Sequence, residues 1–335
     1  MQCLFFVIAF SCAFDKVTDL AGAANFIVLA VLTIFLPPSE FTTRQIVLTS
    51  LVCVTRLELG AYLLYRVLKR GKDSRFDELR SNCLKFFGFW VFQMLWVYLV
   101  SAPLIYVNAS DVDPPLGPAD YVAWAMVTVG FVLQVAADMQ KNRFRSDPAN
   151  AKRVCREGVW RYSRHPNFAG EILLWWGVYL GACPVFMDGA GTHAGFATVV
   201  SPLFTMWVLL CLSGIPQAEG KMSKRWYDGG ESERDYQQYF DSTPPLWPFP
   251  PEVYSRMPLV LKRLLCFECP QQAKGERHSH SHSLSHADPR CSRDLTSGPD
   301  PPFFPPLLFA AAPPRRRRPA PAALTMALTC AREAR

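Results

Sequence analysis

The chain has 335 residues, of which 50% are hydrophobic and 13% aromatic, and its formal net charge is +7. Its mean hydropathy is only +0.09, because a polar C-terminal region dilutes apolar stretches that are long enough to cross a bilayer. The basic residues lie in loops beside those stretches and the eleven Cys are scattered, which argues against nucleic-acid binding, a disulfide framework and a metal site.

Six apolar stretches have about the length of a transmembrane helix. Lys and Arg are concentrated in the loops 69–85 and 138–165 and after residue 217, whereas 108–120 and 184–195 hold none. By the positive-inside rule, the basic loops and the C-terminus face the cytoplasm. We expect an all-α, polytopic membrane bundle of about six to seven helices, located in the endoplasmic reticulum if the source is eukaryotic. The predicted spans are 21–37, 45–66, 86–107, 121–137, 168–187 and 196–215.

The same pattern divides the chain into four regions. Residues 1–14 form an apolar segment that is short for a span, which we interpret as a partial first helix. Residues 15–251 form the transmembrane domain, and residues 252–273 form a cytoplasmic segment next to the membrane. Residues 274–335 have low complexity, with a His-Ser repeat and a run of four Arg, and we expect them to form a disordered tail.

Charged residues lie inside the second predicted span. Glu58 shares a helical face with Tyr62 and Arg66, at steps of four and eight residues. An ionisable residue within a membrane helix indicates a functional site, so Glu58 and Tyr62 are candidate catalytic residues. The structural alternative is that Arg66 reaches to the membrane surface and that Arg56 pairs with an acid on another helix.

The fourth predicted span ends in a second polar group. Asp138, Lys141 and Arg145 share one helical face, at steps of three and seven residues. A carboxylate there could hold a ribose or an amide, and the Arg side chain matches the geometry of a phosphate. The alternative is a cationic anchor at the membrane surface with an internal ion pair.

The segment 163–171, with the sequence SRHPNFAGE, lies at the start of the fifth predicted span. Its proline fits a first helical turn, so a basic loop should end there and a helix begin. Asn167 and Glu171 are then one turn apart, and Arg164 and His165 stand beside a helix N-terminus, which attracts anions. Two alternatives are a loop that only anchors the helix, and a buried ion pair of Glu171 with Arg164 or with a cation from another helix.

This segment resembles the Arg-His-Pro-Asn-Tyr-x-Gly-Glu motif of membrane proteins related to the C-terminal domain of steroid 5-alpha-reductases, and similar motifs occur in membrane sterol reductases. A weaker likeness covers about residues 15–251, and Phe168 stands where the motif has Tyr. The resemblance implies that NADPH binds with Asn167 and Glu171 near its nicotinamide. Similar reductases also place a Glu in an early membrane helix near the substrate carbonyl, as Glu58 would be.

Two further features extend the candidate cofactor site. Tyr236 and Tyr239 precede a Pro-rich run, and related reductases and methyltransferases close their cofactor pocket with a similar segment. Both tyrosines could equally be anchors at the membrane surface. The cations around the motif exceed what a pyrophosphate needs, so we expect NADPH to bind more tightly than NADH. The candidate cofactor-binding residues are Asp138, Lys141, Arg145, Arg161, Arg164, His165, Asn167, Glu171, Tyr236 and Tyr239.

Together these residues predict a membrane-embedded, NADPH-dependent oxidoreductase. It would add a hydride to a carbon–carbon double bond conjugated to a carbonyl in a lipophilic substrate, such as a steroid, a sterol or another lipid enone, which arrives through the membrane lipid. Glu58 or Tyr62 would stabilise or protonate the carbonyl oxygen. The sequence has no P-loop, GxGxxG or Ser-His-Asp pattern. One alternative is an S-adenosylmethionine-dependent methyltransferase, because isoprenylcysteine carboxyl methyltransferases have a similar Arg-His-Pro motif. The other is a non-catalytic lipid-binding membrane protein.

Overall fold

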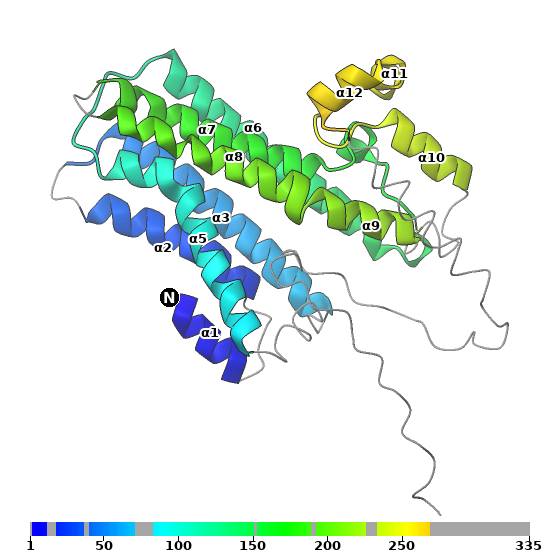
Figure 1. The fold of residues 1–335 in the computed structure, drawn as a ribbon, viewed down its shortest axis with the longest axis horizontal. Helices are drawn as coiled ribbons and strands as arrows, with labels where there is room; N and C mark the ends of the chain where they lie inside the picture. Colours follow the sequence, from blue (N-terminus) through cyan, green and yellow to red (C-terminus); the bar gives the residue numbers. More distant parts are fainter. Residues whose placement is uncertain are drawn as a thin grey trace, which may run out of the picture. The chain divides into compact units, whose positions relative to one another are not determined.

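The computed structural model describes residues 2–11, 18–36, 40–70, 83–150, 153–188, 192–225 and 233–268. Within these ranges the chain forms helices and loops and no strand (Figure 1). The predicted all-α class of polytopic membrane protein is therefore confirmed. The predicted tail 274–335, most of the basic loop 69–85 and Lys152 lie outside the described residues.

Five helical stretches in the described part of the chain are long and apolar enough to cross a membrane. They correspond to the second to sixth predicted spans. Four of them are single helices, and the fifth, His193–Gly220, is built from shorter helical pieces. The single helices are α3 (Thr43–Arg70), α5 (Cys83–Asn108), α6 (Pro118–Ser146) and α7 (Pro166–Asp188).

The N-terminal part of the chain forms two shorter apolar helices. The first predicted span corresponds to α2 (Thr18–Phe35), whose apolar part Leu20–Phe35 is shorter than the roughly 20 residues of a typical span. Two prolines follow at positions 37 and 38, and proline does not continue a helix. The segment 1–14 contains α1 (Gln2–Ser11), as the interpretation of a partial helix predicted.

The last long stretch changes its helical geometry along its length. It runs through η5 (Thr192–Val199), α8 (Val200–Trp207) and η6 (Val208–Leu212), and then into α9 (Ile215–Arg225). The η6 segment is a single turn of π-helix, a form that often occurs near functional sites. It immediately precedes the helix that carries Glu219.

The helices α6 and α7 pack with their backbones in close contact. A Cβ atom on Gly170 would lie 2.5 Å from the carbonyl oxygen of Gly130, and a Cβ on Gly130 would lie equally close to the carbonyl oxygen of Gly170. Small residues at both positions are therefore required for this approach. Gly170 immediately precedes Glu171. The close approach of the two glycines therefore fixes the orientation of the polar residues at the start of α7 relative to α6.

The main apolar core lies between α2, α3, α5, α6 and α7. Trp175 of α7 is fully buried at its centre and packs against Phe26 of α2, with 5.4 Å between the ring centroids. Close packing of this kind holds side chains in single rotamers. The polar face of α7 is therefore supported by a rigid apolar layer one turn further along the helix.

The C-terminal described part consists of three short helices, α10 (Glu233–Ser242), α11 (Pro251–Arg256) and α12 (Leu259–Cys266). The Pro-rich run between α10 and α11 pairs with the loop before α7. The backbone N–H of Arg164 donates to the Pro244 carbonyl at 2.8 Å, and the Ser163 hydroxyl donates to the Leu246 carbonyl at 2.6 Å. These bonds hold the loop before α7 in one conformation.

Candidate functional site

A buried ion pair joins Arg56 of α3 to Glu171 of α7. Two guanidinium nitrogens donate to the two carboxylate oxygens at 2.8 and 2.9 Å. The Arg56 side chain is 1% exposed and the Glu171 side chain 12%. The predicted alternative, in which Arg56 pairs with an acid on another helix, is therefore confirmed, and the partner of Glu171 is Arg56 and not Arg164.

Further groups complete the surroundings of this ion pair. The Trp175 indole N–H donates to Glu171 Oε1 at 2.8 Å, and the Gln134 side chain of α6 also hydrogen-bonds to the carboxylate. The Arg56 guanidinium lies 5.3 Å from the centre of the Trp175 ring and 5.7 Å from that of Phe26, which are favourable cation–π positions. With four hydrogen-bond donors around it, the Glu171 carboxylate has little acceptor capacity left.

Asn167 and Asp138 meet one helical turn before the ion pair. The Asn167 amide nitrogen donates to Asp138 Oδ1 at 3.5 Å, a long hydrogen bond. The Asn167 Oδ1 atom is buried and has no hydrogen-bond partner. A buried acceptor without a partner carries a desolvation cost of about 1 to 3 kcal/mol, so this atom is positioned to accept a hydrogen bond from a bound molecule.

The two candidate catalytic residues lie near this cluster on α3. Asp138 is within electrostatic range of Glu58, Arg66 and Glu171, so the structure brings together acids from α3, α6 and α7. The Tyr62 ring lies beneath Arg66, with 6.0 Å between the guanidinium carbon and the ring centre. The contact of Tyr62 with Arg66 agrees with their predicted shared helical face, and the catalytic role of Glu58 and Tyr62 stays a prediction.

Arg164 is buried and surrounded by acidic groups. It lies 3.1 Å from a carboxylate oxygen of Glu219 on α9 and 2.8 Å from Glu268, which follows α12. The guanidinium carbon of Arg164 also lies 3.6 Å from the centre of the Phe240 ring. Tyr254 of α11 hydrogen-bonds to the same Glu268. Although burial lowers the pKa of Arg164, these two carboxylates outweigh it and raise the pKa above its ordinary value, so Arg164 stays charged.

His165 is also buried, and it contacts the same acid as its neighbour. Its Nε2 lies 3.4 Å from Glu219 Oε1, and its ring stacks on Phe168 with 5.4 Å between centroids. Burial lowers the pKa of His165 below its ordinary value, although the Glu219 carboxylate partly opposes this. The imidazole is therefore neutral at pH 7, and Phe168 fills the position of the usual motif Tyr by ring packing.

The remaining predicted cations lie against aromatic rings or at the surface. Lys141 is 4.1 Å from the centre of the Trp160 ring, and Arg145 is 5.9 Å from that of Phe144. Arg161 is exposed and lies 3.8 Å from Glu252, a separation at which a surface ion pair contributes little. Its guanidinium is accessible to an incoming anion.

Tyr236 and Tyr239 lie together on the inner face of α10, as their spacing predicted. Both are buried in a small cluster with Val154 and Phe240. The Tyr239 hydroxyl donates to the Trp160 carbonyl at 2.7 Å, and burial raises the pKa of this phenol well above its ordinary value. Tyr239 therefore ties α10 to the loop that leads into the motif.

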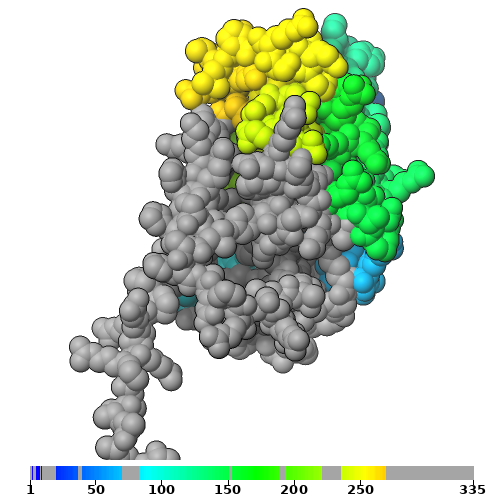
Figure 2. All heavy atoms as spheres, turned by 90° about the vertical axis from the view of Figure 1, so that its right-hand side faces the viewer, coloured from blue at the N-terminus to red at the C-terminus, as the bar shows by residue number. Residues whose placement is uncertain are grey.

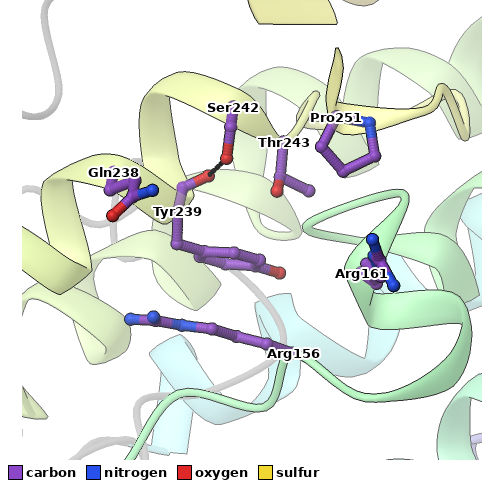
Figure 3. Close-up of a pocket in the computed structure, with 7 residues that line it drawn as sticks. All are labelled: Arg156, Arg161, Gln238, Tyr239, Ser242, Thr243 and Pro251. Atoms are coloured by element: carbon purple, nitrogen blue, oxygen red, sulfur yellow. Dashed lines mark hydrogen bonds between the residues drawn. The ribbon is translucent and has the colours of Figure 1, made fainter.

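An open surface cavity of about 310 Å³ lies beside Tyr239 (Figure 3). The Arg156 side chain extends beneath the Tyr239 ring, with 5.1 Å between the guanidinium carbon and the ring centre. Two arginines and three residues with hydroxyl groups border this cavity, which favours an anionic group such as a phosphate. The lining residues are Arg156, Arg161, Gln238, Tyr239, Ser242, Thr243 and Pro251.

Several residues of this site escaped the sequence analysis. Gln134 was missed because a lone Gln in an apolar span gives no periodic signal. The pairing of Arg164 with Glu268 joins residues 104 positions apart, which no local pattern reveals. Glu219 lies just beyond the sixth predicted span, and only the fold shows that it contacts Arg164 and His165. Within the described ranges no group of three His, Cys, Asp or Glu is placed to hold a metal ion.

Comparisons with known proteins place this site in a family. The chain is 28% identical to an uncharacterised protein of Schizosaccharomyces pombe, in a match that covers 36% of this chain and 44% of the relative. No solved structure matches. Residues 5–243 match the model of a family described as proteins of unknown function (DUF1295), a range that includes most of the site. The chain therefore belongs to the DUF1295 family.

Proposed function

We propose that this protein is a membrane-embedded reductase of the steroid 5-alpha-reductase-like type, which uses NADPH to reduce a conjugated carbon–carbon double bond in a lipophilic substrate. The observation that carries the proposal is the buried Asn167 Oδ1, which lacks a hydrogen-bond partner. Asn167 lies in the first turn of α7, where its amide nitrogen contacts Asp138. The Arg56–Glu171 ion pair lies one helical turn further along α7.

The residues present fit a nicotinamide dinucleotide. A carboxamide N–H would satisfy the Asn167 oxygen, and an uncharged ring suits a position inside the bundle. The phosphates need cations at an accessible surface, and the cavity next to Tyr239 offers Arg156 and Arg161. The bound cofactor would supply the hydride.

The protein's own residues would orient the cofactor and supply the proton. Because Glu171 already accepts hydrogen bonds from Arg56, Trp175 and Gln134, we assign it a positioning role. It fixes the α7 face that presents Asn167 and joins α7 to α3. Glu58 and Tyr62 lie on α3 beyond this ion pair, where either could donate a proton as negative charge develops on the substrate carbonyl oxygen.

Ligand binding to the detergent-purified full-length chain tests this proposal. NADPH, NADH and S-adenosylmethionine are titrated separately, and we expect NADPH to bind most tightly. Asn167→Ala removes one hydrogen bond of about 0.5 to 1.5 kcal/mol, so NADPH affinity should fall roughly two- to tenfold. Asn142→Ala, on the same helix as Asp138 but outside the cluster, is the matched control and should bind as the parent does.

Three results would contradict the proposal. Tight binding of S-adenosylmethionine without NADPH binding would favour a methyltransferase, and no binding of any of the three would favour a non-catalytic lipid-binding protein. If NADPH binds but Asn167→Ala binds it as tightly as the parent, the cofactor lies elsewhere. Loss of NADPH absorbance on addition of a steroid or long-chain enone then tests the reaction itself.

A further inference from the structure

The helix α12 turns its apolar side away from the protein. Cys266 is fully buried and Lys262 partly buried, whereas Val260, Leu264 and Leu265 are 66%, 68% and 51% exposed. At 100° per residue, these three side chains and Leu261 occupy one side of the helix. A helix on the surface of a soluble protein has the opposite arrangement, so this side is expected to contact an apolar phase.

The charges around this apolar side are all positive. Arg256, Lys262 and Arg263 lie within residues 253–267, and this stretch contains no Asp or Glu. Arg256 and Arg263 are exposed, while the Lys262 ammonium lies 4.4 Å from the centre of the Tyr254 ring. An amphipathic helix with apolar residues on one side and flanking cations is typical of a segment that lies in the interface of an anionic bilayer.

The place of α12 near the start of α7 also favours contact with the membrane interface. Glu268, two residues after the helix, pairs with Arg164, and Arg164 lies two residues before α7 begins. Because α7 is one of the five long apolar helices, α12 is anchored at the point where a span would leave the bilayer. Figure 2 shows the yellow and orange atoms of the segment 251–268 at the surface of the molecule.

The segment 251–268 lies beyond the residues that match the family model. The family match ends at residue 243, yet Glu268 pairs with Arg164 inside the SRHPNFAGE motif, and Tyr254 hydrogen-bonds to Glu268. A segment that contributes a buried carboxylate to the motif must be held in place, and α12 has few buried side chains to hold it.

We propose that α12 binds the interface of a phospholipid bilayer that contains anionic headgroups, and that this contact holds Glu268 and Tyr254 against Arg164. The apolar side of α12 enters the boundary between headgroups and acyl chains, and Arg256 and Arg263 contact the phosphates. The contact would act independently of which cofactor the protein uses.

Photo-crosslinking of the full-length protein in nanodiscs tests the lipid contact. A benzophenone side chain is placed at Leu264 on the apolar side, or at Ser255, an exposed residue of α11, as the matched control. With phosphatidylcholine and phosphatidylserine discs, we expect phospholipid adducts at position 264 several-fold above those at position 255. Equal yields at the two positions would overturn the proposal, as would adducts to another protein or to a second copy of this chain.

Hydrogen exchange tests the link to the motif. Replacing two of the exposed leucines of α12, Leu264→Ser and Leu265→Ser, should reduce the docked population roughly tenfold or more. Amide exchange in residues 160–168 should then rise toward that of Glu268→Gln, which removes the carboxylate directly. The matched control is Val253→Ser, an exposed apolar residue outside α12. Unchanged exchange in 160–168 for the double variant, with a clear rise for Glu268→Gln, would show that the bilayer contact does not hold Glu268.

Discussion

The Arg56–Glu171 ion pair gives the sharpest test of how α3 and α7 are joined. Glu171→Gln keeps the size of the side chain but removes the carboxylate that is hydrogen-bonded to the Arg56 guanidinium, which is 1% exposed. Removing one partner of a buried pair costs about 3 to 5 kcal/mol. For a bundle of this size that loss corresponds to a fall in Tm of roughly 6 to 20 °C.

The assay is equilibrium unfolding in mixed micelles, combined with thermal unfolding followed by Trp fluorescence. The double variant Arg56→Met with Glu171→Leu removes both charges and should recover most of the loss, because two apolar side chains of similar volume replace the pair. Glu252→Gln, in an exposed pair with Arg161 at 3.8 Å, is the matched control and should change stability by less than about 1 kcal/mol. A Glu171→Gln variant as stable as this control would refute the reasoning.

Two further predictions follow from the packing and the pH dependence of the motif. Gly170→Ala places a Cβ 2.5 Å from the Gly130 carbonyl and should cost about 1 to 3 kcal/mol, whereas Gly117→Ala, where a Cβ meets nothing within 4 Å, should cost less than about 1 kcal/mol; equal losses in denaturant titrations would contradict this. Because the pKa of His165 is lowered below 6.5 by burial, the unfolded chain binds more protons. The stability from neutral His165 is complete above pH 6.5 and declines as the pH falls toward the folded pKa. His165→Gln should therefore make stability fall less between pH 7 and pH 5, and identical pH profiles would exclude this role.

Periodicity in the sequence predicted the spans and helical faces because both depend on local spacing. It placed Tyr62 with Arg66, and Tyr236 with Tyr239, correctly on shared faces. The short α2 shows the limit of that argument, since an apolar run extended to residue 37 while the helix ends at Phe35. Two consecutive prolines follow at positions 37 and 38, and neither has a backbone N–H to donate to the preceding turn.

Which charges pair across helices could not be predicted in the same way. The sequence offered Arg164 or an unnamed cation as the partner of Glu171, and the structure selects Arg56 at a separation of 115 residues. A cation and an acid that are close in sequence do not pair when the backbone geometry points their side chains toward different neighbours. Arg164 accordingly points to Glu219 and Glu268, which lie more than fifty residues further along the chain.

The contacts of the SRHPNFAGE motif separate its structural positions from the one open to a ligand. Its serine, arginine and histidine bond to the Pro-rich run and to two acids. Its glycine, Gly170, packs against the backbone of α6, and Glu171 joins α7 to Arg56 of α3. Most of the motif thus joins helices that are distant in sequence. Only the Asn167 oxygen, among the motif's described side-chain acceptors, is both buried and without a partner. A motif that served packing alone would have no reason to retain that cost, so the residue that the fold leaves unsatisfied is the one we expect a bound molecule to satisfy.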